Sequence, residues 1–235
     1  MKKMECVFQR YEKKYLLSSR QYLALLEKLA PYMELDVYGK HTICNIYYDT
    51  ESYELIRTSI EKPSYKEKLR IRSYGVPNDD SNVFLELKKK VCGIVYKRRV
   101  CMNYEEAMCY LTYGTISIQS QILKEIDWFL ERYHPNQKTF IAYDRMAYVG
   151  KEDENLRITF DFDLRWRRDH VDLAYGDEGE RILSQDEVLM EIKIPEAMPL
   201  WLSNILNELL IFPVSFSKYG ICYKEHLIDT IRMGG

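Results

Sequence analysis

The stretch LRITFDFDLRWR, residues 156–167, alternates strictly between apolar and polar side chains. One parity holds Leu156, Ile158, Phe160, Phe162, Leu164 and Trp166, and the other holds arginine, threonine and aspartate. Successive side chains of a β-strand point to opposite faces of a sheet, so this pattern predicts a strand with one buried and one charged face. The stretch decides the fold class because four other segments repeat the alternation.

Basic residues mark the polar face of each of these other segments, at 6–17, 65–74, 82–91 and 188–194. Their charged positions are Arg10, Glu12 and Lys14; Lys66, Lys68, Arg70 and Arg72; Glu86, Lys88 and Lys90; and Glu191 and Lys193. One charged stripe alone is typical of a sheet with a solvated face, and that alternative stays open for any single strand. Five stripes together favour an antiparallel sheet that closes on itself and points its cations into one lumen, where a polyanion neutralises them.

The segments between these strands predict the rest of the fold. Further strands are expected at 42–48, 94–102 and 139–149. Helices are expected from the capping box Ser18–Gln21 to Met33, and at 51–59, 104–113, 118–133 and 200–211. Residues 169–185 read as a loop, and 216–227 as a mixed segment. The prediction is an α+β fold of about eight strands and four or five helices, in a single domain over 1–235.

Composition limits the functional classes. The chain has 235 residues, 46% of them apolar and 30% charged, so it can build a core. A net charge of −2 excludes a globally basic nucleic-acid binder, and we expect no nucleic-acid partner. No apolar run approaches the roughly 20 residues of a membrane span, and no apolar segment follows the basic start, so we expect a cytoplasmic protein. The six cysteines are scattered, unlike the ligands of a zinc site.

Seven motifs occur in one order along the chain: RYEKKYLL (10–17), KLRIRSYG (68–75), FLELKKK (84–90), AYDRMAY (142–148), LRITFDFDL (156–164), MEIKI (190–194) and FSKYG (216–220). The ordered set resembles the VTC polyphosphate polymerase domain. That domain is a branch of the triphosphate tunnel metalloenzymes, which include the CYTH-type phosphatases and cyclases. The resemblance implies a closed antiparallel eight-stranded β-barrel that forms a tunnel, with helices packed outside.

The resemblance also implies a site. Its catalytic, phosphate-binding set would be Lys14, Arg70, Arg72, Lys88, Arg145, Arg157, Lys193 and Lys218. Further substrate contacts would come from Arg10, Lys68, Lys97 and Arg99. The implied cofactor is a divalent cation, Mn²⁺ or Mg²⁺, with Glu191 as its ligand and Glu12 and Glu86 as helpers.

One departure from the wider family concerns the first strand. CYTH phosphatases open with the pattern E-x-E-x-K, whereas this chain has Arg10, Glu12 and Lys14. A cation in place of the first acid removes a metal ligand and adds a phosphate contact. The change favours the polymerase branch over a two-metal triphosphate hydrolase. It leaves open whether Glu12 binds metal or only pairs with a neighbouring cation.

The resemblance implies phosphoryl transfer that makes polyphosphate from the γ-phosphate of ATP, with polyphosphate, triphosphate or pyrophosphate as the other partners. An acceptor phosphate is already an anion and needs no general base, which agrees with four histidines that all lie outside the motifs. Two alternatives stay open. The first is a hydrolase of inorganic triphosphate or a nucleoside triphosphate, with Glu12 or Asp161 orienting water. The second is a non-catalytic polyphosphate-binding module.

Overall fold

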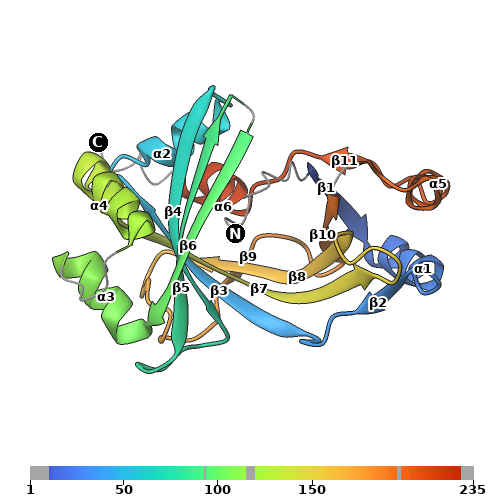
Figure 1. Ribbon diagram of the computed structural model, residues 1–235, viewed down its shortest axis with the longest axis horizontal. Helices are drawn as coiled ribbons and strands as arrows, with labels where there is room; N and C mark the ends of the chain where they lie inside the picture. Colours follow the sequence, from blue (N-terminus) through green and yellow to red (C-terminus); the bar gives the residue numbers. More distant parts are fainter. Residues whose placement is uncertain (1–10, 93, 115–119, 195–196, 229–235) are drawn as a thin grey trace, which may run out of the picture. The chain divides into compact units, whose positions relative to one another are not determined.

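The computed structural model of the chain describes residues 11–92, 94–114, 120–194 and 197–228 (Figure 1). The chain forms two compact units, each assembled from three segments. The first unit contains the chain up to His41, Asp144–Asp163 and Leu183–Phe216. The second contains Thr42–Tyr143, Leu164–Ile182 and the chain from Ser217 onward. Three long strands contribute residues to both units, and the prediction of a single domain stays a prediction.

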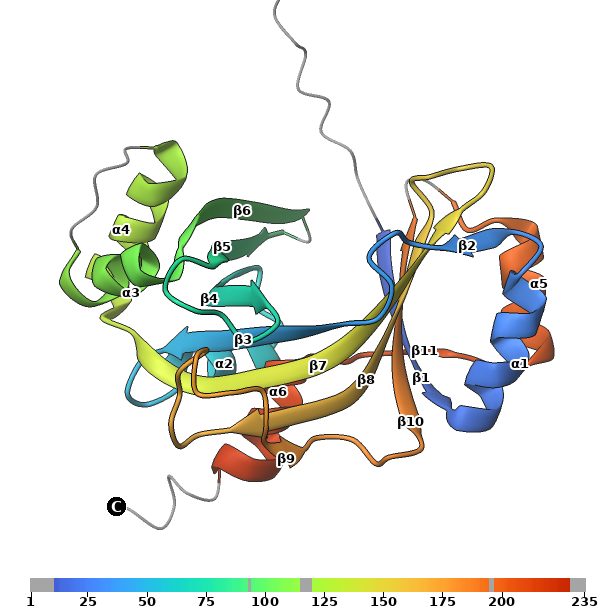
Figure 2. The same ribbon diagram turned by 90° about the horizontal axis from the view of Figure 1, so that it is seen from below.

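The first unit is a sheet covered by two helices. Its strands are β1 (Tyr11–Ser18), β2 (Met33–Leu35), β10 (Glu187–Ile194), β11 (Pro213–Val214) and the adjoining parts of β7 (Asn136–Gly150) and β8 (Arg157–Arg167). Strand β10 pairs antiparallel with both β1 and β8. The helices α1 (Ser19–Leu29) and α5 (Leu200–Glu208) lie side by side, as Figure 2 shows.

The apolar stripes of this sheet face the two helices, as their alternation predicts. Phe160 and Met190 are fully buried in one cluster with Leu25 of α1 and Leu202 of α5. Phe162 is partly buried against the same cluster. The capping box is confirmed, because the Ser18 hydroxyl accepts a hydrogen bond from the backbone of the third helical residue, whose side chain accepts one in return.

Replacing Phe160 with alanine should destabilise the protein by about 3–5 kcal/mol, because the change empties a fully buried site. Phe212→Ala is the matched control, since its side chain is 62% exposed. Equilibrium denaturation by urea measures both variants. A Phe160→Ala midpoint equal to that of the wild type would contradict the assignment of the apolar face.

The second unit has four consecutive antiparallel strands. They are β3 (His41–Asp49), β4 (Tyr65–Tyr74), β5 (Asn82–Val91) and β6 (Ile94–Asn103). Helices α3 (Tyr104–Tyr113) and α4 (Gln121–Tyr133) cover one face and bury Leu69, Leu85 and Leu87 beneath them (Figure 1). The remaining elements are α2 (Glu54–Ile60), β9 (Glu180–Arg181), α6 (Lys218–Cys222) and a π-helical turn at Tyr223–Leu227.

The alternation of 156–167 holds only as far as Phe162. Asp163 has a positive φ of 45°, a conformation that interrupts an extended strand. Leu164, Arg165 and Trp166 are then buried in succession, and Trp166 stacks on His226 with ring centroids 4.8 Å apart. Trp166 therefore does not continue the apolar stripe that Phe160 begins.

The order of the strands is β11-β1-β10-β8-β7-β3-β4-β5-β6, with β2 joined to β7 and β9 to β8. The α+β class with a large antiparallel sheet is confirmed. Among the described residues the order has two ends and eleven strands, so the closed eight-stranded barrel stays a prediction. The three strands in excess, β2, β9 and β11, have only two or three residues each and are too short to produce an alternation.

Two further expectations concern membrane-spanning segments and the state of the cysteines. None of the helices that the structure describes is long and apolar enough to cross a membrane. Cys44, Cys92, Cys101, Cys109 and Cys222 are free thiols, and Cys6 lies outside the described residues.

Candidate functional site

The face of β4, β5 and β6 that points away from α3 and α4 carries a dense set of basic side chains. The strand register places Lys66 opposite Lys90, Lys68 opposite Lys88, and Arg70 opposite Glu86. On the other side of β5, Lys88 is opposite Lys97 and Glu86 is opposite Arg99. We call this surface the basic face; its charged members are Lys66, Lys68, Arg70, Arg72, Glu86, Lys88, Lys90, Lys97 and Arg99. The register thus brings the charged stripes of three predicted strands onto one surface.

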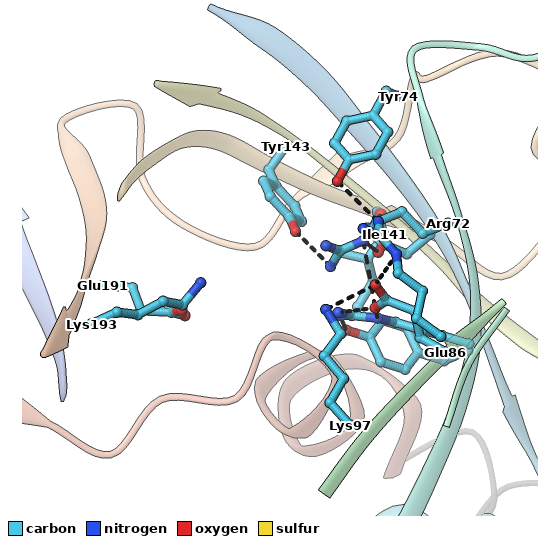
Figure 3. A network of polar contacts seen from close by, with 12 residues as sticks. Arg72, Tyr74, Glu86, Lys97, Ile141, Tyr143, Glu191 and Lys193 are labelled. Atoms are coloured by element: carbon cyan, nitrogen blue, oxygen red, sulfur yellow. Dashed lines mark hydrogen bonds and ion pairs between the residues drawn. The ribbon is translucent and has the colours of Figure 1, made fainter. Parts of the chain in front are cut away.

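Glu86 lies at the centre of four cations (Figure 3). Its carboxylate oxygens lie 2.6 Å from Arg70, 3.9 Å from Arg72, 3.0 Å from Lys97 and 3.1 Å from Arg99. Burial alone would raise the pKa of Glu86, but the charges of Arg70, Arg72 and Lys97 outweigh it and hold that pKa well below its usual range. This Glu86 cluster keeps a net positive charge, because one carboxylate cannot balance four cations.

Polar groups of β3 and β7 orient the two arginines. The Arg72 guanidinium donates hydrogen bonds to Asn45 Oδ1 at 2.9 Å and to the Tyr143 hydroxyl at 3.2 Å. Arg70 donates to the Tyr47 hydroxyl at 3.0 Å. These three partners are not among the site residues predicted from the sequence. A polar Asn45 inside the otherwise apolar run of β3 was the one available signal.

Helix α6 places Lys218 beside Tyr143, the tyrosine that Arg72 also contacts. The Lys218 ammonium lies 4.3 Å from the centroid of the Tyr143 ring. The next residue, Tyr219, stacks on Tyr47 at 4.8 Å and donates a hydrogen bond of 2.9 Å to the buried Asp49. Lys218 and Arg72 thus both contact Tyr143, and a role for Lys218 in phosphate binding stays a prediction.

The other end of the basic face is made of lysines. Lys66 donates to the Ser59 carbonyl at 2.8 Å, and Lys68 lies 3.4 Å from the Ser217 hydroxyl. Burial and the nearby charges of Lys90 and Lys88 lower the pKa of Lys66. Within these described strands, Glu86 is the single acid among eight basic residues of the face. Such an excess of fixed positive charge attracts polyanions, with the arginines able to grip two oxygens at once.

A second charged group lies in the first unit, on β1 and β10. The register puts Glu12 opposite Lys193 and Lys14 opposite Glu191. Lys14 Nζ lies 3.5 Å from Glu12 and 3.9 Å from Glu191, and Lys193 Nζ lies 3.1 Å from Glu191. We call these four residues the Glu191 cluster. Figure 3 shows Glu191 and Lys193 as neighbours on one face of β10.

A divalent cation fits the Glu191 cluster better than it fits Glu86. No group of three acidic, histidine or cysteine ligands occurs in the part of the chain that the structure describes. Mg²⁺ and similar ions bind through one or two carboxylates plus water and substrate phosphates, and Glu12 and Glu191 both approach the Lys14 ammonium. At Glu86 an incoming dication would meet four cationic side chains within 4 Å.

Two predicted phosphate-binding arginines of the first unit have acidic partners. Arg145 makes a bidentate pair with the fully buried Asp161, at 2.6 and 2.8 Å. Arg157 pairs with Asp36. Asp161, a candidate for orienting water in a hydrolase, is thus bound to an arginine. Arg10 lies outside the described residues, and the role of each residue in substrate or metal binding stays a prediction.

Comparisons with known proteins show which folds and which family the chain is similar to. A proposed adenylate cyclase from Bacillus halodurans is similar in structure, with a TM-score of 0.56, 15% identity, and 88% of this chain and 92% of that chain covered. A proposed adenylyl cyclase from Hippeastrum is described as having a dominant triphosphatase activity. It is similar with a TM-score of 0.54 and 16% identity, and the match covers 92% of this chain and 96% of that chain. No curated protein matches the chain. The family model of the VTC domain matches residues 9–226, and the chain therefore belongs to the VTC domain family.

Proposed function

We propose that this protein catalyses metal-dependent phosphoryl transfer and makes inorganic polyphosphate from the γ-phosphate of ATP. The observation that carries the proposal is the basic face, where eight cations and one acid share a single surface of a VTC-family chain. A linear polyanion is the ligand that such a surface binds best, because each of its phosphates contributes negative charge. The similarity to a protein with triphosphatase activity supports a substrate of the triphosphate class.

In the proposed reaction, a terminal oxygen of the growing chain attacks the γ-phosphorus of ATP. The bond between that phosphorus and the β–γ bridging oxygen breaks, and ADP leaves with the electron pair. Arg70, Arg72 and Lys218 hold phosphate oxygens in place and neutralise charge as it develops. In the first unit, Glu191 and Glu12 would hold a divalent cation, which would supply charge neutralisation to phosphate oxygens when bound.

The products distinguish this function from its alternatives. Purified protein is incubated with ATP and Mn²⁺ or Mg²⁺, and the products are separated on a gel stained for polyphosphate. We expect ADP and a ladder of long polyphosphate chains, with one phosphate added to the chains for each ADP released. Orthophosphate without a ladder would show a hydrolase instead, and tight polyphosphate binding without turnover would show a binding module.

A further inference from the structure

The basic face ends in an aromatic group, two residues beyond Arg72 along β4. Tyr74 is 50% exposed, and its ring lies edge-on to Phe84 with centroids 5.6 Å apart. The Arg99 guanidinium lies 3.7 Å from the centroid of Phe84 and donates a hydrogen bond of 3.0 Å to the Tyr74 hydroxyl. We call Tyr74, Phe84 and Arg99 the aromatic step.

The aromatic step and the Glu86 cluster share one residue. Arg99 also lies 3.1 Å from Glu86, so its planar group connects the cluster to the two rings. Figure 3 shows Tyr74 beside this network, with its hydroxyl turned toward it. Tyr74 is the fourth residue after Arg70 along β4, which is about 13 Å of strand.

The two ends of the basic face therefore offer different chemistry. Beyond Glu86 in one direction the face presents Lys66, Lys68, Lys88 and Lys90, which suit a ligand of uniform negative charge. In the other direction it presents an exposed aromatic ring and a flat guanidinium. A ligand made of phosphate alone gains no stacking contact from that end, whereas a heteroaromatic ring can stack on an aromatic ring or a guanidinium.

We propose that the aromatic step binds the nucleobase of a nucleoside triphosphate whose phosphates lie on the Glu86 cluster. This inference rests on the proposed function, because it assumes that the basic face binds the triphosphate. It also sets a direction: the nucleoside lies at the Tyr74 end, and chains of phosphate alone lie at the lysine end. Tyr74 supplies a half-exposed ring, and its hydrogen bond to Arg99 holds the guanidinium beside Phe84.

The test compares a nucleotide with its bare phosphate counterpart. Calorimetry measures the binding of ATP and of inorganic triphosphate to the full chain in EDTA, where no turnover occurs. We expect Tyr74→Ala to weaken ATP binding about tenfold or more, the usual effect of removing one base-stacking ring, and to leave inorganic triphosphate within about twofold. Tyr74→Trp should restore ATP affinity, because tryptophan offers a larger ring.

Tyr113→Ala is the matched control, since Tyr113 is a 75% exposed tyrosine at the end of α3, away from the basic face. It should change neither affinity. Unchanged ATP binding in Tyr74→Ala would overturn the inference. An equal loss for both ligands would overturn it as well, because Tyr74 would then act on the phosphates through Arg99. If the wild type binds neither ligand, the proposed function fails; if it binds inorganic triphosphate normally and Tyr74 has no effect, only the base subsite fails.

Discussion

Arg70→Ala should lower the rate of phosphoryl transfer by about 10²–10³-fold while the protein stays folded. Arg70 points from β4 onto the basic face, where its fixed charge is expected to stabilise the transferred phosphate. Three other cations remain beside Glu86, so the buried carboxylate keeps its charge balance after the change. Initial rates of ADP release measure the effect, and circular dichroism with a thermal melt checks the fold.

Arg98→Ala is the matched control for this variant. Arg98 is one residue away from Arg99 on β6, so it lies on the opposite face, where it pairs with Glu125 of α4. Its removal should leave the rate near that of the wild type. Full activity in Arg70→Ala, or loss of its fold, would contradict the assignment. Arg72→Ala should lower the rate to a similar degree, with a larger cost in stability because Arg72 additionally binds Asn45 and Tyr143.

Glu191→Gln should raise the concentration of Mn²⁺ needed for half-maximal turnover by about tenfold or more. The amide keeps the shape of the side chain but loses the charge that attracts a dication. Binding of ATP in EDTA should persist or tighten, because the change removes a negative charge beside Lys14 and Lys193. Electron paramagnetic resonance of free Mn²⁺ measures metal affinity directly, independently of turnover.

Glu208→Gln controls for a general effect of removing a carboxylate from the first unit. Glu208 forms a surface pair with Lys28, and its side chain is 62% exposed. We expect its Mn²⁺ affinity to equal that of the wild type. If Glu191→Gln also behaves in this way, Glu191 is only a counter-ion for Lys14 and Lys193.

The elements that local sequence determines were predicted closely. The bounds of β4, β5 and α3 agree with the structure, because turn residues and an N-cap stand at their ends. The errors arise where a strained residue, or pairing with a distant strand, determines the end of an element. Helix α5 was expected to reach Ile211 but ends at Glu208, before Leu210 with its positive φ of 53°. Helix α1 was expected to reach Met33, which instead begins β2 and pairs with β7.

The candidate site was also predicted only in its local features. Parity alone predicts which side chains of one strand share a face, and Arg70, Arg72, Glu86 and Lys88 followed it. Parity does not give the register between strands, so it could not show that β4 and β6 place four cations around Glu86. Asn45 and Tyr47 were missed because β3 is buried almost throughout, and its sequence resembles a core strand.

The lysine end of the basic face has a consequence for how a bound polyphosphate chain would move along it. Its rungs, Lys66 with Lys90 and Lys68 with Lys88, repeat along the strands at about 6.6 Å and are chemically alike. Under the proposed function, a polyphosphate displaced by one rung would meet a similar pair of ammonium groups, so the two positions would differ little in energy. No single register would then trap the chain, and small thermal steps would move it past the arginines. A surface built from similar rungs would thus hold a long product firmly across its path and weakly along it.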